Sequence, residues 1–539
     1  MAILCVVITA CNQNSTTGDG KGNTTEQYKL AIEYLDSLPR LGDSSKVDIG
    51  LRDLEKAANR GFRDAQYTLG VLYSNGKYVK QDYTKAAKLY TKAAKQGSPY
   101  GQLRLGIAYY TGLGVQLNYA TAAEWFTKAA EQGVAEAQFN LGMLYRHGQG
   151  VEQDNEKAAI WYEKAAEQGV AEAQYNLGFF YLNGTGVKKD EHIAVEWFEK
   201  AAEQGDADAQ YNMGIAYHRG TVVKKDEHIA AEWFEKAAEQ GVAKAQYNLG
   251  TFYLNGTGVK KDEHIAVEWF EKAAEQGDAD AQYNMGIAYL YGTVVKKDEH
   301  IAAEWFEKAA KQGYSDAEYM LGLLNYESQN QNKEKAMAYF HSAADKGNSK
   351  ALYKLGTIYA SQDDYSRAFP MFEAAAKQGH TDALISLAQC YYQGTGVPQN
   401  LNSAAKYYMA AAKAGNPDAQ YNIGQFYLDG IGVEKNVLQG LEWLNKAADQ
   451  GNVYAEYVLG TNYLNGYKGF KKDITKGVNF IMRSAKHGFA GAQTVLGSCY
   501  LLGVGVAQNT DEGFKWLHKA AEQGDPEAIN ALQMAGLLY

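Results

Sequence analysis

The sequence predicts an all-α fold made of about thirteen stacked two-helix repeats, and three observations lead to it. Glycine is abundant, with 56 residues among 539, whereas proline is scarce, with 6. A Leu-Gly, Met-Gly or Ile-Gly pair returns every 32 to 37 residues. Between these pairs the apolar residues follow helical spacing. Self-similarity at a fixed period of this length is the sequence signature of a repeat protein.

The glycine of each pair marks the first helix of a repeat, which we name helix A. A small residue at this slot lets two helices approach closely. Seven steps of 36 residues come first, and steps of 34, 32, 36, 36 and 37 follow. A partial unit with Gln533 in the slot ends the series. The slot is filled by Gly70, Gly106, Gly142, Gly178, Gly214, Gly250, Gly286, Gly322, Gly356, Ala388, Gly424, Gly460 and Gly497.

The second helix, helix B, is typified by "HIAVEWFEKAAEQ" at residues 192–204. We expect Asp190 to cap its start and Gly205 to end it. The eight tryptophans all share one slot on its apolar face. A tryptophan ladder could stack on carbohydrate, but its regular place on an apolar face favours core packing. The tryptophans are Trp125, Trp161, Trp197, Trp233, Trp269, Trp305, Trp443 and Trp516.

The repeat unit resembles a known family. It reads A-x-A-Q-Y-N-L-G-x-x-Y-x-x-G-x-G-V and then A-A-E-W-F-x-K-A-A-E-Q-G, which is similar to Sel-one-like repeats (SLR) over residues 50–535. These are relatives of the tetratricopeptide repeat. The resemblance implies a right-handed α-solenoid whose concave face binds proteins or peptides. The resemblance also implies the roles that such proteins have in bacteria, as envelope adaptors, virulence factors, regulators of cell-wall enzymes and immunity proteins.

From the resemblance we expect a monomeric protein-binding scaffold or adaptor of the bacterial envelope, with no catalytic residue, cofactor or metal. One alternative is an immunity protein or an inhibitor of an envelope-acting enzyme. Another is a hydrolase of the Cys-rich SLR type, but those proteins carry a cysteine pair in each repeat and this chain has four cysteines in total. Because the net charge is −10 and no basic stripe is present, nucleic acid is excluded as the partner.

The amino terminus contains a candidate lipidation site. Residues 8–11, "ITAC", resemble the bacterial lipobox, in which the cysteine, here Cys11, carries the lipid. The apolar run before it is too short to span a bilayer and matches the core of a signal peptide. The resemblance therefore implies a periplasmic protein held to a membrane by its lipid. Lipoproteins retained at the inner membrane commonly carry an aspartate after the lipidated cysteine; because this chain has Asn12 there, the resemblance favours the outer membrane. Signal peptides normally begin with a positively charged region, but no Lys or Arg precedes this apolar run. The alternative to a signal peptide is therefore a short disordered terminus on a cytoplasmic protein.

The pattern varies along the chain. Between Gly322 and Ala388 the repeats are short and lose their Gly-x-Gly loop, and Pro370 falls inside a helix B, which we expect to bend or shorten. A break in curvature is expected at 325–375, and helices at 25–37 and 46–58 are expected to cap the array. The expected segments are 1–24 (signal, lipobox and tether), 25–60 (capping helices), 61–322 (first arm), 323–388 (irregular repeats) and 389–539 (second arm with a carboxyl-terminal cap).

Three groups of residues could carry chemistry. His192, His228, His264 and His300 form a ladder, but each repeat offers one histidine, and neighbours about 10 Å apart cannot share an ion. We interpret them as exposed helix residues. The Gly-x-Gly loops, such as 184–186, follow a helix rather than a strand and are interpreted as turns. Cys390 and Cys499 lie three repeats apart and are expected to be buried free thiols.

The candidate binding surface is a stripe along helix A. Positions two before, one after and five after the glycine share one face, opposite the packing residues. The mixture of amides, aromatic rings and arginine is typical of protein recognition. The alternative for asparagine is a merely solvated residue. The candidates are Arg104, Asn140, Met143, His147, Asn176, Phe179, Asn212, Arg219, Asn248, Asn284 and Tyr291.

A tandem duplication points to the same stripe. Residues 175–241 and 247–313 differ at only four positions. Three of them lie at or near the exposed side of helix A, so the copies vary where packing demands least. The pairs are Phe179/Thr251, His218/Leu290, Arg219/Tyr291 and Glu239/Lys311.

Overall fold

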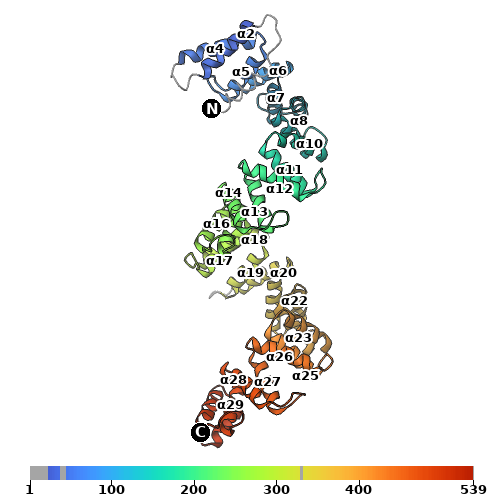
Figure 1. Cartoon of the computed structure of the whole chain (residues 1–539), viewed down its shortest axis with the longest axis vertical. Helices are drawn as coiled ribbons and strands as arrows, with labels where there is room; N and C mark the ends of the chain where they lie inside the picture. Colours follow the sequence, from blue (N-terminus) through green and yellow to red (C-terminus); the bar gives the residue numbers. More distant parts are fainter. Residues whose placement is uncertain (1–21, 37–43, 328–331, 538–539) are drawn as a thin grey trace. The chain divides into compact units, whose positions relative to one another are not determined.

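The computed structural model describes residues 22–36, 44–327 and 332–537 (Figure 1). Within these ranges it contains 29 helices and no strand, which confirms the all-α prediction. The helices α2 (Gly22–Asp36) and α4 (Ser44–Asn59) precede the array and match the two expected capping helices. Cys11 and the rest of the predicted signal and lipobox lie outside the described residues. No described helix has the length and apolarity needed to cross a membrane.

Each repeat contributes one helix A, and most are thirteen residues long. A partial repeat, α31 (Pro526–Met534), follows the last complete one. The A helices are α5 (Arg63–Asn75), α7 (Pro99–Thr111), α9 (Ala135–His147), α11 (Ala171–Asn183), α13 (Ala207–Arg219), α15 (Ala243–Asn255), α17 (Ala279–Tyr291), α19 (Ser315–Glu327), α21 (Ser349–Ala360), α23 (Thr381–Gln393), α25 (Pro417–Asp429), α27 (Val453–Asn465) and α29 (Ala490–Leu502).

Each helix A is followed by a helix B that packs against it, and successive pairs stack into a solenoid. The chain divides into two compact units, Met1–Ala281 and Gln282–Tyr539. The B helices are α6 (Tyr83–Lys95), α8 (Tyr119–Glu131), α10 (Asn155–Glu167), α12 (Glu191–Glu203), α14 (Glu227–Glu239), α16 (Glu263–Glu275), α18 (Glu299–Lys311), α20 (Lys333–Asp345), α22 (Tyr365–Lys377), α24 (Leu401–Lys413), α26 (Val437–Asp449), α28 (Ile474–Lys486) and α30 (Thr510–Glu522).

The two helices of a repeat meet at the glycine slot. A Cβ atom added to Gly214 would lie 2.6 Å from the ring of Phe234, the residue that follows the tryptophan slot of helix B. Carbon atoms without a bond between them pack at about 3.5–4.0 Å, so any side chain here would displace the ring. An aromatic ring lies against the glycine in the same way at Gly70, Gly106, Gly142, Gly178, Gly250, Gly286, Gly322 and Gly356, and an aliphatic side chain does so at Gly424, Gly460 and Gly497.

The turns between helices follow the expected chemistry. Helix α11 ends at Gly184, whose φ of 69° lies in the left-handed region that favours glycine. Asp190 caps α12 by accepting hydrogen bonds from the backbone N–H groups of His192 and Ile193. A Cβ atom on Gly186 would lie 2.2 Å from the Asn155 carbonyl oxygen of the preceding repeat. The Gly-x-Gly loop is therefore a turn packed against its neighbour, as predicted.

A pair of glutamines links helices A and B of each of nine repeats, and one of the two also bonds to the preceding repeat. Gln138 of α9 is 5% exposed, and its side-chain amide donates to the Ala130 carbonyl oxygen of the preceding repeat at 3.1 Å. Its oxygen accepts from Gln168, which ends α10, at 2.7 Å. Both ends of a buried amide are thus satisfied. The pairs are Gln66/Gln96, Gln102/Gln132, Gln138/Gln168, Gln174/Gln204, Gln210/Gln240, Gln246/Gln276, Gln282/Gln312, Gln420/Gln450 and Gln493/Gln523.

Two repeats replace the buried glutamine with glutamate, and cationic or ionisable groups then replace its glutamine partner. Glu318 accepts from Lys346 at 2.8 Å. Glu456 has no exposed surface, and its carboxylate accepts from Arg483 Nε and lies against His487 Nδ1, both at 2.9 Å. A buried carboxylate requires such partners, since an unpaired charge is costly to desolvate. The exchange keeps the same link between helices A and B.

The sequence predicts that Pro370 bends or shortens its helix; the shortening is wrong, and the bend stays a prediction. Helix α22 has thirteen residues, as the other B helices do, and runs through Pro370. Proline removes one hydrogen bond to the carbonyl group four residues earlier, but Ala368, Phe372 and Ala375 remain buried on the opposite side and hold the helix. The irregularity lies instead in α21, which ends at Ala360 and leaves four residues before α22. The five-segment division and the break in curvature stay predictions.

We predict that Gly214→Ala destabilises the protein. The added methyl group meets the Phe234 ring and costs about 1–3 kcal/mol of overpacking, although alanine favours helix by about 1 kcal/mol over glycine. Gly491→Ala is the matched control, since its Cβ would lie 3.1 Å from the edge of the half-buried Phe489 ring and 3.8 Å from Tyr457. Chemical denaturation measures both variants. A stabilised Gly214→Ala variant would contradict the close contact.

We also predict that Glu456→Gln lowers the free energy of unfolding by about 1–3 kcal/mol, because Arg483 and His487 lose their shared carboxylate. The loss lies at the low end of that range, since the Arg483 side chain is 43% exposed and water screens its charge. The double variant Glu456→Gln/His487→Gln rebuilds the glutamine pair and recovers part of the loss. Equal stability of the single variant and the wild type would refute the pairing.

Candidate protein-binding surface

The eleven stripe residues all lie at half-buried or exposed positions of the A helices. The row five after the glycine is the most open: His147 and Arg219 are exposed, and Tyr291 is 65% exposed. In the row one after the glycine, Phe179 is 38% exposed and Met143 is half-buried. The asparagines two before the glycine are half-buried. The stripe therefore contains rows that differ in how much surface they offer.

The asparagine row joins neighbouring repeats. Burial raises the pKa of the Tyr175 hydroxyl, and a hydrogen bond from Asn212 of the next repeat opposes that shift. Asn248 acts in the same way on Tyr211, whose pKa burial also raises. Asn212 in addition donates to the Asp208 carbonyl oxygen at 2.9 Å. These asparagines are thus more than solvated residues: they stabilise the stack.

Arg104 occupies the same slot and is also engaged. Its guanidinium lies 3.5 Å from the Glu136 carboxylate of the next repeat. Burial lowers the pKa of Arg104, but Glu136 and Tyr67 together raise it above its ordinary value. Tyr67 belongs to the preceding repeat, so Arg104 bridges three repeats. Its positive charge therefore interacts mainly with Glu136 inside the protein.

The sequence analysis missed Arg146, which lies four residues after the glycine. Its guanidinium donates to the Asn176 side chain and lies 5.6 Å from the centre of the Phe180 ring. It also covers Phe179 at 5.9 Å. Positions one and four after the glycine are three residues apart and therefore share a helix face. Extending the stripe by that spacing would have found Arg146 and His218.

Two of the four positions that vary between the duplicated segments lie one and five residues after the glycine. Phe179 and its counterpart Thr251 lie one after the glycine, and Arg219 and Tyr291 lie five after it. Among the described residues, the Arg219 and Tyr291 side chains are exposed and take part in no hydrogen bond or ion pair. We name these two rows, one and five residues after the glycine, the open rows. They contain the most exposed residues of the stripe, although Met143 packs against the core.

The tryptophan ladder is occupied by the protein's own residues. Each tryptophan is half-buried, and Trp161, for example, packs against the core of the preceding repeat. A lysine three residues later covers every ring, with Nζ 3.6–4.3 Å from the ring centre. Cation–π pairs of this kind contribute about 0.5–1 kcal/mol at exposed sites. The core-packing interpretation is confirmed.

The histidine ladder is exposed on helix B. His192, His228, His264 and His300 all face solvent. His228 Nε2 lies 3.5 Å from the Glu232 carboxylate, which is the i, i+4 pair expected from the sequence. Among the described residues, no group of three or more His, Cys, Asp or Glu side chains is placed to hold a metal ion.

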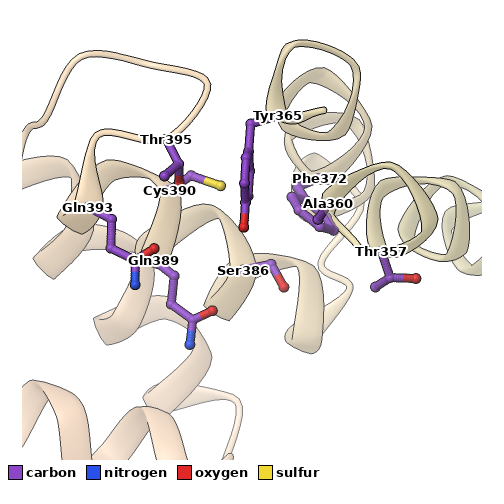
Figure 2. A pocket seen from close by; sticks show the side chains of 9 residues that line it. All are labelled: Thr357, Ala360, Tyr365, Phe372, Ser386, Gln389, Cys390, Gln393 and Thr395. Carbon is purple, nitrogen blue, oxygen red and sulfur yellow. The ribbon is translucent and has the colours of Figure 1, made fainter. Parts of the chain in front are cut away.

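A cavity of about 260 Å³ lies in the second unit, between the repeats at 349–380 and 381–416 (Figure 2). The Tyr365 ring is one of its walls, with the Cys390 sulfur pointing toward one side of the ring and Phe372 lying on the other side. Cys390 and Cys499 are both buried free thiols, as predicted. The cavity is lined by Thr357, Ala360, Tyr365, Phe372, Ser386, Gln389, Cys390, Gln393 and Thr395.

The repeats define a class of protein: an α-solenoid built from thirteen short helical pairs. The chain belongs to the Sel1 repeat family, which confirms the resemblance found in the sequence. The Sel1 repeat matches residues 63–98, 99–134, 135–170, 171–206, 207–242, 243–278, 279–314, 315–348, 349–380, 381–416, 417–452, 453–489 and 490–525.

Solved and curated relatives agree with this assignment. The crystal structure of c5321, a protective antigen present in uropathogenic Escherichia coli strains, displays an SLR fold and superposes with a TM-score of 0.67. Its sequence is 31% identical, and the match covers 90% of this chain and 97% of that one. An uncharacterised Sel1-like repeat-containing protein of Schizosaccharomyces pombe is 36% identical over 81 residues, which are 15% of this chain and 12% of the yeast protein. The match thus spans about an eighth of that curated relative.

We predict that the two kinds of stripe residue respond differently to truncation. Asn212→Ala removes an inter-repeat hydrogen bond and lowers the free energy of unfolding by about 1 kcal/mol. Arg219→Ala, on an open row seven residues later, changes it by less than about 0.5 kcal/mol. Denaturant titrations of the two variants measure the difference. Equal losses would show that the open rows also hold the stack together.

Proposed function

We propose that the protein is a scaffold that binds another protein through the open rows of its A helices. The supporting observation is the division of roles along each helix A. The glycine slot and the asparagine row are used for packing, whereas the open rows present His147, Phe179, Arg219 and Tyr291 to solvent. Arginine and aromatic side chains are the residues on which protein interfaces most depend.

We further propose that the scaffold acts as a monomer in the bacterial envelope, anchored through a lipid on Cys11. The lipobox-like residues 8–11 support the anchor. The similarity to c5321, described as a protective antigen of uropathogenic Escherichia coli, is in keeping with an envelope location. In a sharper form of the proposal, the partner is an envelope-acting enzyme that the scaffold inhibits, as an immunity protein or a regulator of a cell-wall hydrolase does.

Capture from an envelope fraction of the host bacterium tests the binding proposal. The intact protein should retain one partner, and the double variant Arg219→Ala/Tyr291→Ala should lose it. Ile160→Ala is the control, because Ile160 is 50% exposed on a B helix outside the stripe. A captured nuclease, lipase or cell-wall hydrolase that loses activity in the complex would support the inhibitor form. Equal capture by the double variant would contradict the assignment to the open rows, and substrate turnover with no stable partner would contradict the scaffold itself.

The anchor has its own test. Cys11→Ala removes the only thiol that fits the lipobox, so the variant should move from the membrane fraction to the soluble fraction while its folding is unchanged. Cys5→Ala is the matched control and should stay with the membrane. A Cys11→Ala variant that remains membrane-bound would exclude lipidation at this residue.

A further inference from the structure

The cavity in the second unit lies where one repeat lacks a large side chain that most of the others have. The slot four residues after the glycine carries large side chains in most repeats, but in the repeat at 349–380 it carries Ala360. The connection to α22 is also shortened to four residues and turns at Asp363, with φ of 57°. Space that a side chain and a loop fill elsewhere is therefore open. The large side chains in this slot are Tyr110, Arg146, Leu182, His218, Leu254, Leu290, Tyr326, Tyr392, Leu428, Leu464 and Leu501.

The cavity opens on the same face as the candidate binding stripe. Ser386, Gln389 and Gln393 line it, and they lie two before, one after and five after Ala388, which fills the glycine slot. Gln389 and Gln393 are exposed and belong to the open rows. Ser386 hydrogen-bonds to Tyr353 of the preceding repeat, as the asparagine row does elsewhere. A partner lying along the open rows would pass directly over the opening.

The chemistry of the walls selects the occupant. None of the nine lining residues carries a charge at neutral pH, so an ionic group inside would be desolvated without a counter-charge. Phe372 and Tyr365 provide aromatic walls that favour another ring. The rim supplies amides and hydroxyls, and the buried Thr395 Oγ1 has the Cys390 thiol beside it. An aromatic ring with a neutral polar tip satisfies all of these groups.

The size agrees with a single side chain. An apolar cavity of about 150 Å³ is large enough to hold benzene. Drug-sized ligands occupy pockets of about 300–1,000 Å³. The present volume of about 260 Å³ lies between them and suits one ring with a hydroxyl group.

We propose that this cavity is an anchor pocket that takes one tyrosine side chain of the partner protein. The inference deepens the proposed function and rests on it for the source of the tyrosine. The tyrosine ring of the partner packs beside Tyr365, and its hydroxyl reaches the polar groups around Thr395 and Gln389. Deeply seated aromatic anchors of this kind carry most of the binding energy at protein interfaces.

The first experiment uses p-cresol, the analogue of a tyrosine side chain, and the full chain. Saturation-transfer NMR should show p-cresol binding, with toluene and 4-methylbenzoate binding more weakly because the first lacks the hydroxyl and the second is charged. Ala360→Leu restores the side chain found at Leu182 and Leu254, and it should weaken p-cresol binding by at least about tenfold while preserving the unfolding midpoint. Leu438→Ala, at a residue 81% exposed on α26, is the control.

The two buried thiols give a second readout that needs no variant. Cys390 and Cys499 share one slot, two residues after the glycine position, and burial raises the pKa of both thiols. Only Cys390 lines the cavity. A small neutral reagent such as N-ethylmaleimide should therefore alkylate Cys390 faster than Cys499, and p-cresol should slow the reaction at Cys390 alone. Equal rates with and without p-cresol would overturn the pocket.

The outcomes separate this inference from the proposed function. If p-cresol binds and protects Cys390 but no protein is captured by the chain, the pocket stands and the scaffold proposal fails. If a partner is captured through the open rows and Ala360→Leu captures it equally well, the anchor fails and the scaffold stands. If toluene and p-cresol bound with equal affinity, the cavity would not recognise the hydroxyl group, and the assignment to tyrosine would be wrong.

Discussion

The contact between the glycine slot of helix A and the large side chain of helix B sets the geometry of the whole array. Because glycine has no Cβ atom, the Phe234 ring can lie directly against the Gly214 backbone, and the two helices are close enough for the ring to be buried completely. The same contact recurs in both units with Phe, Tyr, Leu or Ile as the partner. A fixed distance between helices then lets the smaller links, the glutamine pairs and the asparagine–tyrosine contacts, repeat in register.

This regularity explains how function can be carried by so few positions. In each helix A, one side is used for the glycine contact and the buried glutamine, and the asparagine row is used for the next repeat. The open rows are what remain, and in the duplicated segments two of the four differences between the copies fall in them. A scaffold that lengthens by duplication can therefore change its recognition surface without disturbing the contacts that hold it together.

Much of the fold could be predicted from sequence because periodicity and turn chemistry are local. The glycine slots, the caps such as Asp190 and the tryptophan packing all follow from residue spacing. The glutamine pairs, the role of Asn212 and the bridging by Arg104 could not, because they depend on which residues of adjacent repeats come into contact. Pro370 misled the sequence analysis because its cost is local, whereas the packing that holds α22 is not. The cavity lies where Ala360 replaces a larger side chain, and a single small residue does not form a recognisable sequence motif.

Site-specific photocrosslinking in the host cell tests the central claim most directly, namely that the open rows of helix A meet a partner protein. A photoreactive phenylalanine analogue would replace Tyr291 on an open row, or Leu438 on a B helix of the same unit, both of which are largely exposed. The account predicts one discrete crosslinked protein from position 291 and none from position 438. Crosslinks from position 438 alone, or the same product from both, would contradict it.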